Sequence, residues 1–353
     1  MTRAPQAALP PTERLHPRAD DLDLLPVEAV VRRLHQEDLI ALRAVREALP
    51  AIAVAARTVA EALRVGGRLL YVGAGTSGRL GVLDASECPP TFGVPATCVQ
   101  AAIAGGKRAL TRAVEGAEDD VEAGARAVRA FRATARDVVC GISASSSTPY
   151  VRGALDEARR LGARTVLVCC NPPGRAMRAD TVVLARTGPE VVAGSTRLKA
   201  GTATKLVLNA LTTAAFVALG KVYRGRMVDV RPTNAKLRAR AARMVAELTD
   251  LPAARARALL DASGDSVKLA LAMHFTGLPA AQARRRLQSE GLRTLAPSVP
   301  GRASKRGGRR ASTPVENPRG KRPQTAGAAR PQTAPPPAQA AKTRRDKQPK
   351  RQG

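Results

Sequence analysis

Two stretches of the chain share one pattern, in which an unbroken apolar run leads into a short turn of glycine and hydroxyl residues and then into an amphipathic segment. The first stretch spans residues 69–79 and the second spans residues 138–149. An unbroken apolar run is typical of a strand that is covered on both faces. In the turn that follows, backbone N–H groups and hydroxyls converge at a helix N-terminus, where an anion is stabilised. The pattern therefore predicts two strand–turn–helix units of one parallel sheet, with a phosphorylated small molecule as the ligand.

Short apolar runs alternate with segments of helical periodicity through the middle of the chain. The runs lie near residues 68–72, 97–103, 138–143, 165–170 and 181–186. The helical segments between them include residues 77–84, 118–133 and 150–161. This alternation predicts an α/β fold with a doubly wound, mostly parallel five-stranded sheet.

Helical segments are also predicted before and after the sheet. Residues 26–64 hold an apolar stripe on a charged helix, and Pro50 is expected to divide this segment into two helices. The stripe is formed by Val27, Val30, Val31, Leu34, Leu39, Leu42, Val45 and Leu49. After the sheet, we expect a helix over residues 200–220, another from Pro232 to Leu248, and a small helical bundle over residues 250–292.

The formal net charge of +29 is unevenly distributed, because residues 297–353 hold 15 Lys and Arg against two Asp and Glu. This segment also has 10 of the 26 prolines and no aromatic residue, so it is expected to be disordered. A solubilising role is the favoured interpretation, and weak, nonspecific contact with a polyanion is the alternative. The predicted division is a flexible leader (1–25), an α/β domain with N-terminal helices (26–230), a helical region (231–296) and a disordered basic tail rich in Pro and Ala (297–353).

The remaining composition favours a cytoplasmic protein without a metal or another cofactor. No apolar run approaches the length of a membrane span, and the first residues lack the apolar segment of a secretory signal. The five cysteines have no metal-ligand spacing, and free buried thiols are expected. The three histidines do not cluster with cysteines or acidic residues.

The hydroxyls of the two turns favour direct binding of a phosphate. Although Gly73 to Gly78 have the spacing of a dinucleotide fingerprint, no acidic residue ends a convincing second strand about 20 residues later. The alternative for any single hydroxyl is that it caps the helix that follows. The candidate ligands of the phosphate are Thr76 and Ser77 in the first turn, and Ser143, Ser145, Ser147 and Thr148 in the second.

Two glutamates are candidates for general acid–base chemistry. Glu87 precedes Pro89 and Pro90, where a helix is expected to break, and Glu118 opens the next helix. Both are expected in loops near the first turn, where one protonated and one ionised carboxyl group would suit acid–base work. For Glu118 the alternative is an ordinary acidic residue in the first turn of a helix, facing its dipole.

A third segment, residues 190–202, combines an acidic residue, hydroxyls and two cations before a long helix. Its candidate substrate-binding residues are Glu190, Ser195 and Thr196. They could close the site over a sugar phosphate, or a hydroxyl could simply cap the helix.

Taken together, these segments resemble the N-acetylmuramic acid 6-phosphate etherases, over roughly residues 10–295. The resemblance is carried by residues 73–80, 84–93, 114–119, 194–202 and 227–230, of which the Glu-Cys-Pro-Pro-Thr stretch is the most specific. It implies a sugar isomerase (SIS) phosphosugar-binding domain in a cytoplasmic homodimer that needs no metal. The implied reaction cleaves the lactyl ether of N-acetylmuramic acid 6-phosphate and gives N-acetylglucosamine 6-phosphate and D-lactate, as in cell-wall amino-sugar recycling.

By the same resemblance, Glu87 is the proton donor and Glu118 the second catalytic acid/base. The chain departs from the family in two places: Ser146 and Ser147 stand where the family usually has Gly-Arg, and His16 stands where it often has Asn. Three alternative functions remain. They are a non-catalytic phosphosugar-sensing regulator, an aldose–ketose isomerase and a nucleic-acid-binding regulator. The pair of glutamates argues against the first, and the Glu-Cys-Pro-Pro segment argues against the second.

Overall fold

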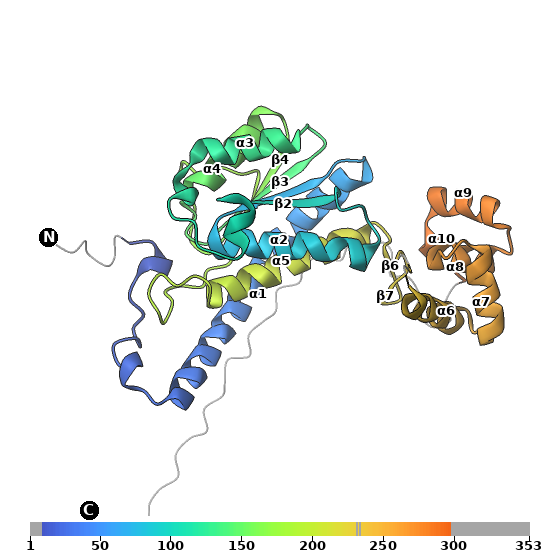
Figure 1. The fold of residues 1–353 in the computed structure, drawn as a ribbon, viewed down its shortest axis with the longest axis horizontal. Helices are drawn as coiled ribbons and strands as arrows, with labels where there is room; N and C mark the ends of the chain where they lie inside the picture. The colour runs from blue at the N-terminus through green and yellow to red at the C-terminus, as the bar shows by residue number, and fades with distance from the viewer. Residues whose placement is uncertain (1–8, 231, 233, 298–353) are drawn as a thin grey trace, which may run out of the picture. The chain divides into compact units, whose positions relative to one another are not determined.

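A five-stranded parallel sheet forms the centre of the computed structural model, which describes residues 9–230, 232 and 234–297. Its strands are β1 (Leu69–Gly73), β2 (Val99–Ile103), β3 (Val138–Ser143), β4 (Arg164–Cys169) and β5 (Thr181–Leu184). Their order is β2-β1-β3-β4-β5, and every neighbouring pair is parallel (Figure 1). The five predicted strands and their parallel arrangement are therefore confirmed.

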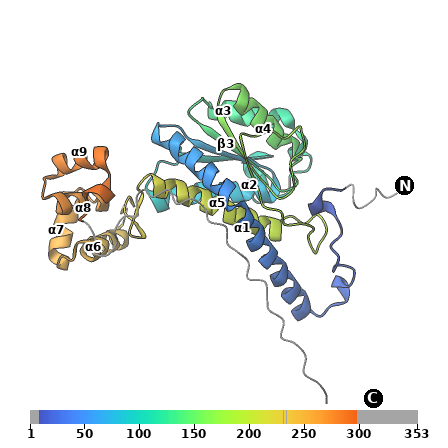
Figure 2. The same cartoon turned by 180° about the vertical axis from the view of Figure 1, so that it is seen from behind.

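Helices cover both faces of this sheet, as Figures 1 and 2 show from opposite sides. One face carries α1 (Val27–Arg64), α2 (Gly75–Phe92) and α5 (Lys199–Ala218), and the other carries α3 (Val121–Phe131) and α4 (Pro149–Arg160). Alternate residues of each strand point to opposite faces. Cys140 therefore packs with the first set of helices and Val139 with the second. The unbroken apolar runs are explained by this double cover.

The long N-terminal helix differs from its prediction in two ways. It runs without a break through Pro50, because the residues on either side of the proline, Ala48 and Ile52, are buried against the core. This packing outweighs the roughly 3 kcal/mol that an interior proline costs a helix. The predicted apolar stripe is also not the packed face, since Val27 is 73% exposed and Leu49 is 50% exposed. Alanines form most of the packed face instead.

The C-terminal region has a small core of its own, built from short helices after a two-stranded hairpin. The hairpin strands are β6 (Val222–Tyr223) and β7 (Arg226–Met227), and they were not predicted from the sequence. The helices are α6 (Ala235–Thr249), α7 (Ala253–Ala262), α8 (Val267–Thr276), α9 (Ala280–Glu290) and α10 (Leu292–Leu295). The helical bundle predicted for residues 250–292 is thus confirmed. The helix expected from Pro232 begins instead at Ala235, after its cap Asn234.

The part of the predicted leader that is described, residues 9–25, contains two short 3-10 turns, η2 (Pro11–Glu13) and η3 (Leu22–Leu24). Thr12 is fully buried and exchanges hydrogen bonds with Asn171, whose Nδ2 lies 2.8 Å from the Thr12 hydroxyl. The predicted tail lies outside the described residues. Across the described ranges, no helix combines the length and the apolar character that a membrane span needs.

Candidate functional site

The strand order creates a crevice at the carboxyl edge of the sheet, between β1 and β3. The chain leaves β1 through α2 on one face of the sheet, and it leaves β3 through α4 on the other face. Connections that diverge in this way from neighbouring strands leave a crevice between them, where ligands of such sheets bind. Gly73 and Ile142 are paired in the ladder, so the two strands end level with one another. The two glycine/hydroxyl turns therefore flank the same crevice.

The first turn brings the start of α2 very close to the end of β1. A Cβ atom on Gly73 would lie 2.8 Å from the backbone N of Gly78, and one on Gly78 would lie 2.7 Å from the Gly73 oxygen. Both positions therefore require glycine. Within the described residues, the hydroxyls of Thr76 and Ser77 have no hydrogen-bond partner, so they are available to a ligand at the N-terminus of α2.

The hydroxyls of the second turn bond mostly to one another. Ser143 Oγ lies 2.8 Å from Thr148 Oγ1, and Ser147 Oγ donates to Ser145 Oγ at 2.9 Å. Thr148 is the N-cap residue of α4, yet its side chain accepts no hydrogen bond from the helix backbone. The Thr148 side chain therefore does not cap α4, whereas Ser145 Oγ accepts a hydrogen bond from the Ser147 backbone N–H at 3.3 Å. The hydroxyls of this turn form a polar cluster at a helix N-terminus.

A cavity of about 430 Å³ adjoins the second turn. Ser145 and Ser147 line it, together with Pro10 and Pro11 of the leader and Arg152 from the first turn of α4. The Arg152 side chain is half-buried and has no carboxylate partner among the described residues. It places a cation beside the hydroxyl cluster. The sequence analysis missed this residue, although its position one helical turn after Thr148 was a signal that could have identified it.

The third predicted segment is held in place by Glu190, which is fully buried. The Glu190 carboxylate accepts hydrogen bonds from the backbone N–H groups of Ala200 at 2.9 Å and Lys199 at 3.3 Å, at the start of α5. Burial raises the pKa of this carboxyl group, and these N–H donors oppose the shift. Glu190 therefore supports the segment from inside.

Unlike the buried Glu190, the hydroxyl residues of the segment 190–202 are partly exposed. Ser195 and Thr196 are half-buried, and their hydroxyls have no partner within the described part of the chain. A Cβ atom on Gly201 would lie 3.4 Å from the Thr196 oxygen and 3.6 Å from the Thr76 methyl group. The start of α5 thus lies next to the first turn.

Glu87 does not lie in a loop, which corrects the expectation from the sequence. α2 continues through Pro89 and Pro90 and ends at Phe92, where Gly93 adopts a left-handed conformation and its N–H bonds back to Pro89. Glu87 is exposed on this helix. Eleven residues separate it from Thr76, or about 16 Å along the axis at 1.5 Å per residue. At 3.6 residues per turn, both lie on the same face of α2.

Glu118 does lie in a loop, in the 3-10 turn η5 (Ala117–Asp119) before α3. Asp120, not Glu118, caps α3 by accepting a hydrogen bond from the Ala123 N–H at 2.7 Å. The segment that leads to Glu118 is tied to α2, because the Arg79 guanidinium donates to the Leu110 and Arg112 carbonyls, both at 3.2 Å. Glu118 is exposed, and neither it nor Glu87 has an ion-pair partner among the described residues.

Below the exposed face of α2 lies a buried polar contact. Asp84 accepts hydrogen bonds from the Tyr71 hydroxyl at 2.9 Å and the Thr212 hydroxyl at 3.2 Å. Burial raises the pKa of this carboxyl group, while the two hydrogen bonds oppose the shift. The contact fixes α2 against β1 and α5. In the described ranges, no group of three or more metal-ligating side chains is present.

The chain is similar to several known proteins. Residues 51–159 match the family described as the glucokinase regulatory protein N-terminal SIS domain. The chain is 50% identical over 281 residues to an N-acetylmuramic acid 6-phosphate etherase of Synechocystis sp., covering 79% of this chain and 92% of the relative. It is 53% identical over 290 residues to the etherase of Gloeobacter violaceus, covering 82% and 95%. The solved phosphoheptose isomerase GmhA from Neisseria gonorrhoeae is 21% identical, with a TM-score of 0.41, covering 54% of this chain and 98% of that chain.

Proposed function

This chain belongs to the family of N-acetylmuramic acid 6-phosphate etherases, and from that premise we propose how its residues carry out the reaction. The enzyme is a carbon–oxygen lyase that acts on N-acetylmuramic acid 6-phosphate, in the catabolism of this amino sugar. It releases D-lactate and leaves N-acetylglucosamine 6-phosphate. The observation that carries the proposal is the convergence of two hydroxyl-rich turns on one crevice, beside a helix that bears an exposed glutamate.

The 6-phosphate binds at the carboxyl edge of the sheet. Thr76 and Ser77 offer free hydroxyls at the N-terminus of α2, and the second turn offers its own cluster at the N-terminus of α4. Both helix N-termini favour negative charge. Ser147 stands where the family usually has an arginine, and Arg152 supplies a guanidinium group beside the same turn. A phosphate held by hydroxyls and a nearby guanidinium fixes one end of the substrate.

The sugar extends from this phosphate along the exposed face of α2. Glu87 lies about 16 Å from Thr76 along the helix and on the same face, so its side chain reaches back toward the sugar from beyond the phosphate end. In its open-chain form, the sugar carries the C1 aldehyde that makes the C2 proton acidic. Ser195 and Thr196 close the site from the side of α5, where Glu190 holds their segment.

The chemistry is an elimination followed by an addition. Glu118 abstracts the proton from C2, the bond between C3 and the ether oxygen breaks, and Glu87 protonates the departing lactate oxygen. Water then adds to the double bond, with its hydroxyl at C3 and a proton returned to C2. Positioned carboxyl groups can supply both proton transfers, and no cofactor takes part in this scheme.

The enzyme acts as a homodimer in the cytoplasm. The support for a dimer is the apolar face that α1 leaves exposed, formed by Val27, Val31, Leu39, Leu42, Leu49 and Val54. Six large apolar side chains exposed on one helix favour a partner surface. The five free cysteines suit a reducing compartment.

D-lactate release from N-acetylmuramic acid 6-phosphate tests this proposal in the wild type, Glu87→Gln and Glu118→Gln. The matched control is Glu115→Gln, which removes another exposed carboxylate from the segment that carries Glu118. We expect both site variants to slow release by about 100-fold or more, the usual contribution of a general acid or base, and the control to keep full activity. Binding of the phosphosugar without any release by the wild type would contradict the proposal and favour a phosphosugar sensor.

A further inference from the structure

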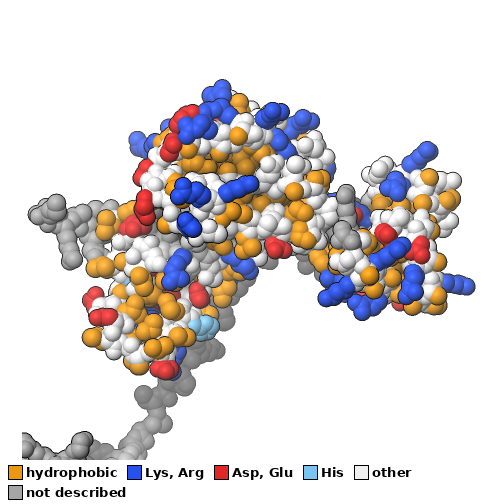
Figure 3. Space-filling view, viewed as in Figure 1, with side chains coloured by type: hydrophobic (Ala, Val, Ile, Leu, Met, Phe, Trp, Pro, Cys, Tyr) orange, Lys and Arg blue, Asp and Glu red, His pale blue; other side chains and the backbone are white. Residues whose placement is uncertain are grey.

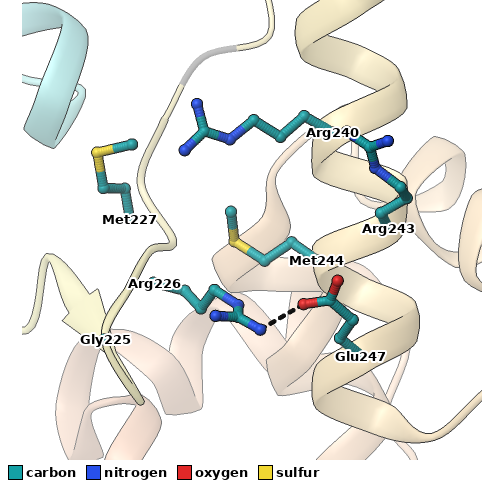
Figure 4. Close-up of a pocket in the computed structure, with 7 residues that line it drawn as sticks. All are labelled: Gly225, Arg226, Met227, Arg240, Arg243, Met244 and Glu247. Carbon is teal, nitrogen blue, oxygen red and sulfur yellow. Dashed lines mark hydrogen bonds and ion pairs between the residues drawn. The ribbon is translucent and has the colours of Figure 1, made fainter.

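A second cationic cavity lies outside the crevice, between the β6–β7 hairpin and α6. Its volume is about 490 Å³, and it is lined by three arginines, two methionines, Gly225 and Glu247 (Figure 4). None of these residues belongs to the hydroxyl turns or to the segments that carry Glu87 and Glu118. A volume of this size is typical of a site for a small molecule.

The charges in this cavity are not balanced within the described residues. Arg226 from the hairpin forms an ion pair with Glu247, as the dashed line in Figure 4 marks. Arg240 and Arg243 have no carboxylate partner among the described residues. With three guanidinium groups and one carboxylate, the lining keeps two uncompensated positive charges.

Arg238, on the same helix, differs from Arg240 and Arg243 because it has carboxylate partners. Arg238 donates to Asp261 at 3.0 Å and to Asp265 at 2.8 Å, so both sides of its guanidinium are occupied. Arg240 and Arg243 are three residues apart on α6. In Figure 4 the Arg240 side chain extends across the cavity and the Arg243 side chain runs along the helix, and neither guanidinium group has a hydrogen-bond partner among the described residues.

The cavity walls come from the β6–β7 hairpin and from α6. Arg224 and Gly225 have φ values of 47° and 73°, and this tight turn directs Arg226 toward α6. In Figure 4, Arg240 extends from α6 across the cavity toward the hairpin segment that carries Met227. Met244 is 5% exposed and belongs to the core of the C-terminal helices. The two methionines give the cavity an apolar side beside its cations.

We propose that this cavity binds a small phosphate monoester at a site separate from the crevice. A phosphate monoester carries a charge of about −1.5 to −2 at pH 7, which matches the two uncompensated charges. A single carboxylate would neutralise only one of them. Guanidinium groups also bind phosphate oxygens in a bidentate manner. The lining has no aromatic side chain on which a nucleobase could stack, which favours a sugar phosphate over a single-stranded nucleic acid.

The surroundings of the cavity attract anions. Residues 234–297 hold 11 Lys and Arg against five Asp and Glu. Figure 3 shows Lys and Arg side chains gathered on the visible face of the C-terminal helices. A surface of this sign raises the local concentration of a phosphorylated ligand and its rate of association.

Calorimetric titration of the full chain with glucose 6-phosphate tests the proposal, with glucose as the neutral probe. We expect two binding sites in the wild type. In the double variant Arg240→Gln/Arg243→Gln, we expect one site to remain and the other to weaken about tenfold or more. Arg255→Gln, an exposed arginine on α7, is the matched control and keeps both sites. All variants are first compared with the wild type by circular dichroism.

Three outcomes would overturn the proposal. The first is unchanged binding in the double variant, and the second is binding of glucose as tightly as glucose 6-phosphate. The third is loss of D-lactate release in the double variant, because the cavity would then serve the catalytic site. Arg240→Lys keeps the positive charge but removes the planar guanidinium group. An affinity between those of the wild type and the double variant would support bidentate binding of the phosphate.

Discussion

At the scale of single residues, Ser146 combines backbone strain with a compensating contact. Its φ of 61° lies in the left-handed region, where a side chain costs roughly 1–2 kcal/mol and glycine costs nothing. The buried Ser146 hydroxyl donates a hydrogen bond to the backbone oxygen of Asn171. Asn171 in turn holds Thr12 of the leader. The strained serine thus connects the second hydroxyl turn to the segment that covers it.

We predict that Ser146→Ala lowers the free energy of unfolding by about 1–2 kcal/mol, because the strain stays and the buried hydrogen bond is lost. Ser146→Gly loses the same hydrogen bond but relieves the strain, so its stability should remain near that of the wild type. Urea denaturation of the three proteins measures the difference. Equal destabilisation by Ala and Gly would show that strain at this position is negligible.

At the scale of elements, a buried ionic cluster joins the leader to two helices. Glu37 of α1 accepts hydrogen bonds from Lys199 at the start of α5 at 2.5 Å and from Arg18 at 2.7 Å. His16 Nε2 lies 3.2 Å from the same carboxylate. Burial raises the pKa of Glu37, but Lys199 and its other cationic neighbours outweigh that effect and lower the pKa overall. The Glu37 carboxylate is therefore favoured, and its contacts hold the leader against α1 and α5.

The pKa of His16 is lowered, chiefly by burial; Glu37 opposes this shift, and the charges of Lys199 and Arg18 add to it. As pH falls through about 6.5, the unfolded chain binds a proton that the folded chain resists, so stability should fall. We predict a smaller loss of stability between pH 7 and pH 5.5 in His16→Asn than in the wild type. Urea denaturation across this range measures both slopes, and parallel slopes would contradict the prediction.

The alanine face of α1 shows how packing overrides local signals at the same scale. Large apolar residues usually mark the face of a helix that packs, yet here Ala41, Ala44 and Ala48 are buried. Small residues let α1 lie close to α5, and the larger Leu42 stays 51% exposed. Neither the choice of face nor the continuity through Pro50 follows from helical periodicity alone.

At the scale of the whole molecule, the exposed apolar face of α1 points to a second copy of the chain. We predict that Leu42→Lys shifts the protein from dimer to monomer, because a buried charge without a partner is costly at an interface. Since Leu42 is already half-exposed in the single chain, the fold should tolerate the change.

Light scattering after size-exclusion chromatography measures this effect. Val217→Lys, which changes an apolar residue of α5 that is 49% exposed, is the control and should leave the mass unchanged. A dimer that persists in Leu42→Lys would place the interface elsewhere.

Much of the fold could be predicted from the sequence, because the signals for it are local. An apolar run between polar turns forms a strand wherever it packs, and the five predicted runs match β1 to β5 within a few residues. The glycines of the first turn could also be identified, since only a residue without a side chain permits the contact between Gly73 and Gly78. The sequence predicts Glu118 both in a loop and at the start of the next helix. It lies in the 3-10 turn η5, and α3 begins only at Val121, after the cap residue Asp120.

The tertiary structure alone decided where helices continue despite an interior proline and which distant segments pack together. Strand order, which opens the crevice between β1 and β3, depends on contacts between residues far apart in the sequence. The same contacts keep Glu87 on a continuous helix despite Pro89 and Pro90, and they bring Arg152 and the leader to one cavity. The sequence by itself determined the five strands of the sheet and the polar turns that follow β1 and β3, because backbone preferences act over a few residues. The structure decided their arrangement, because burial free energy is gained only where distant surfaces pack together.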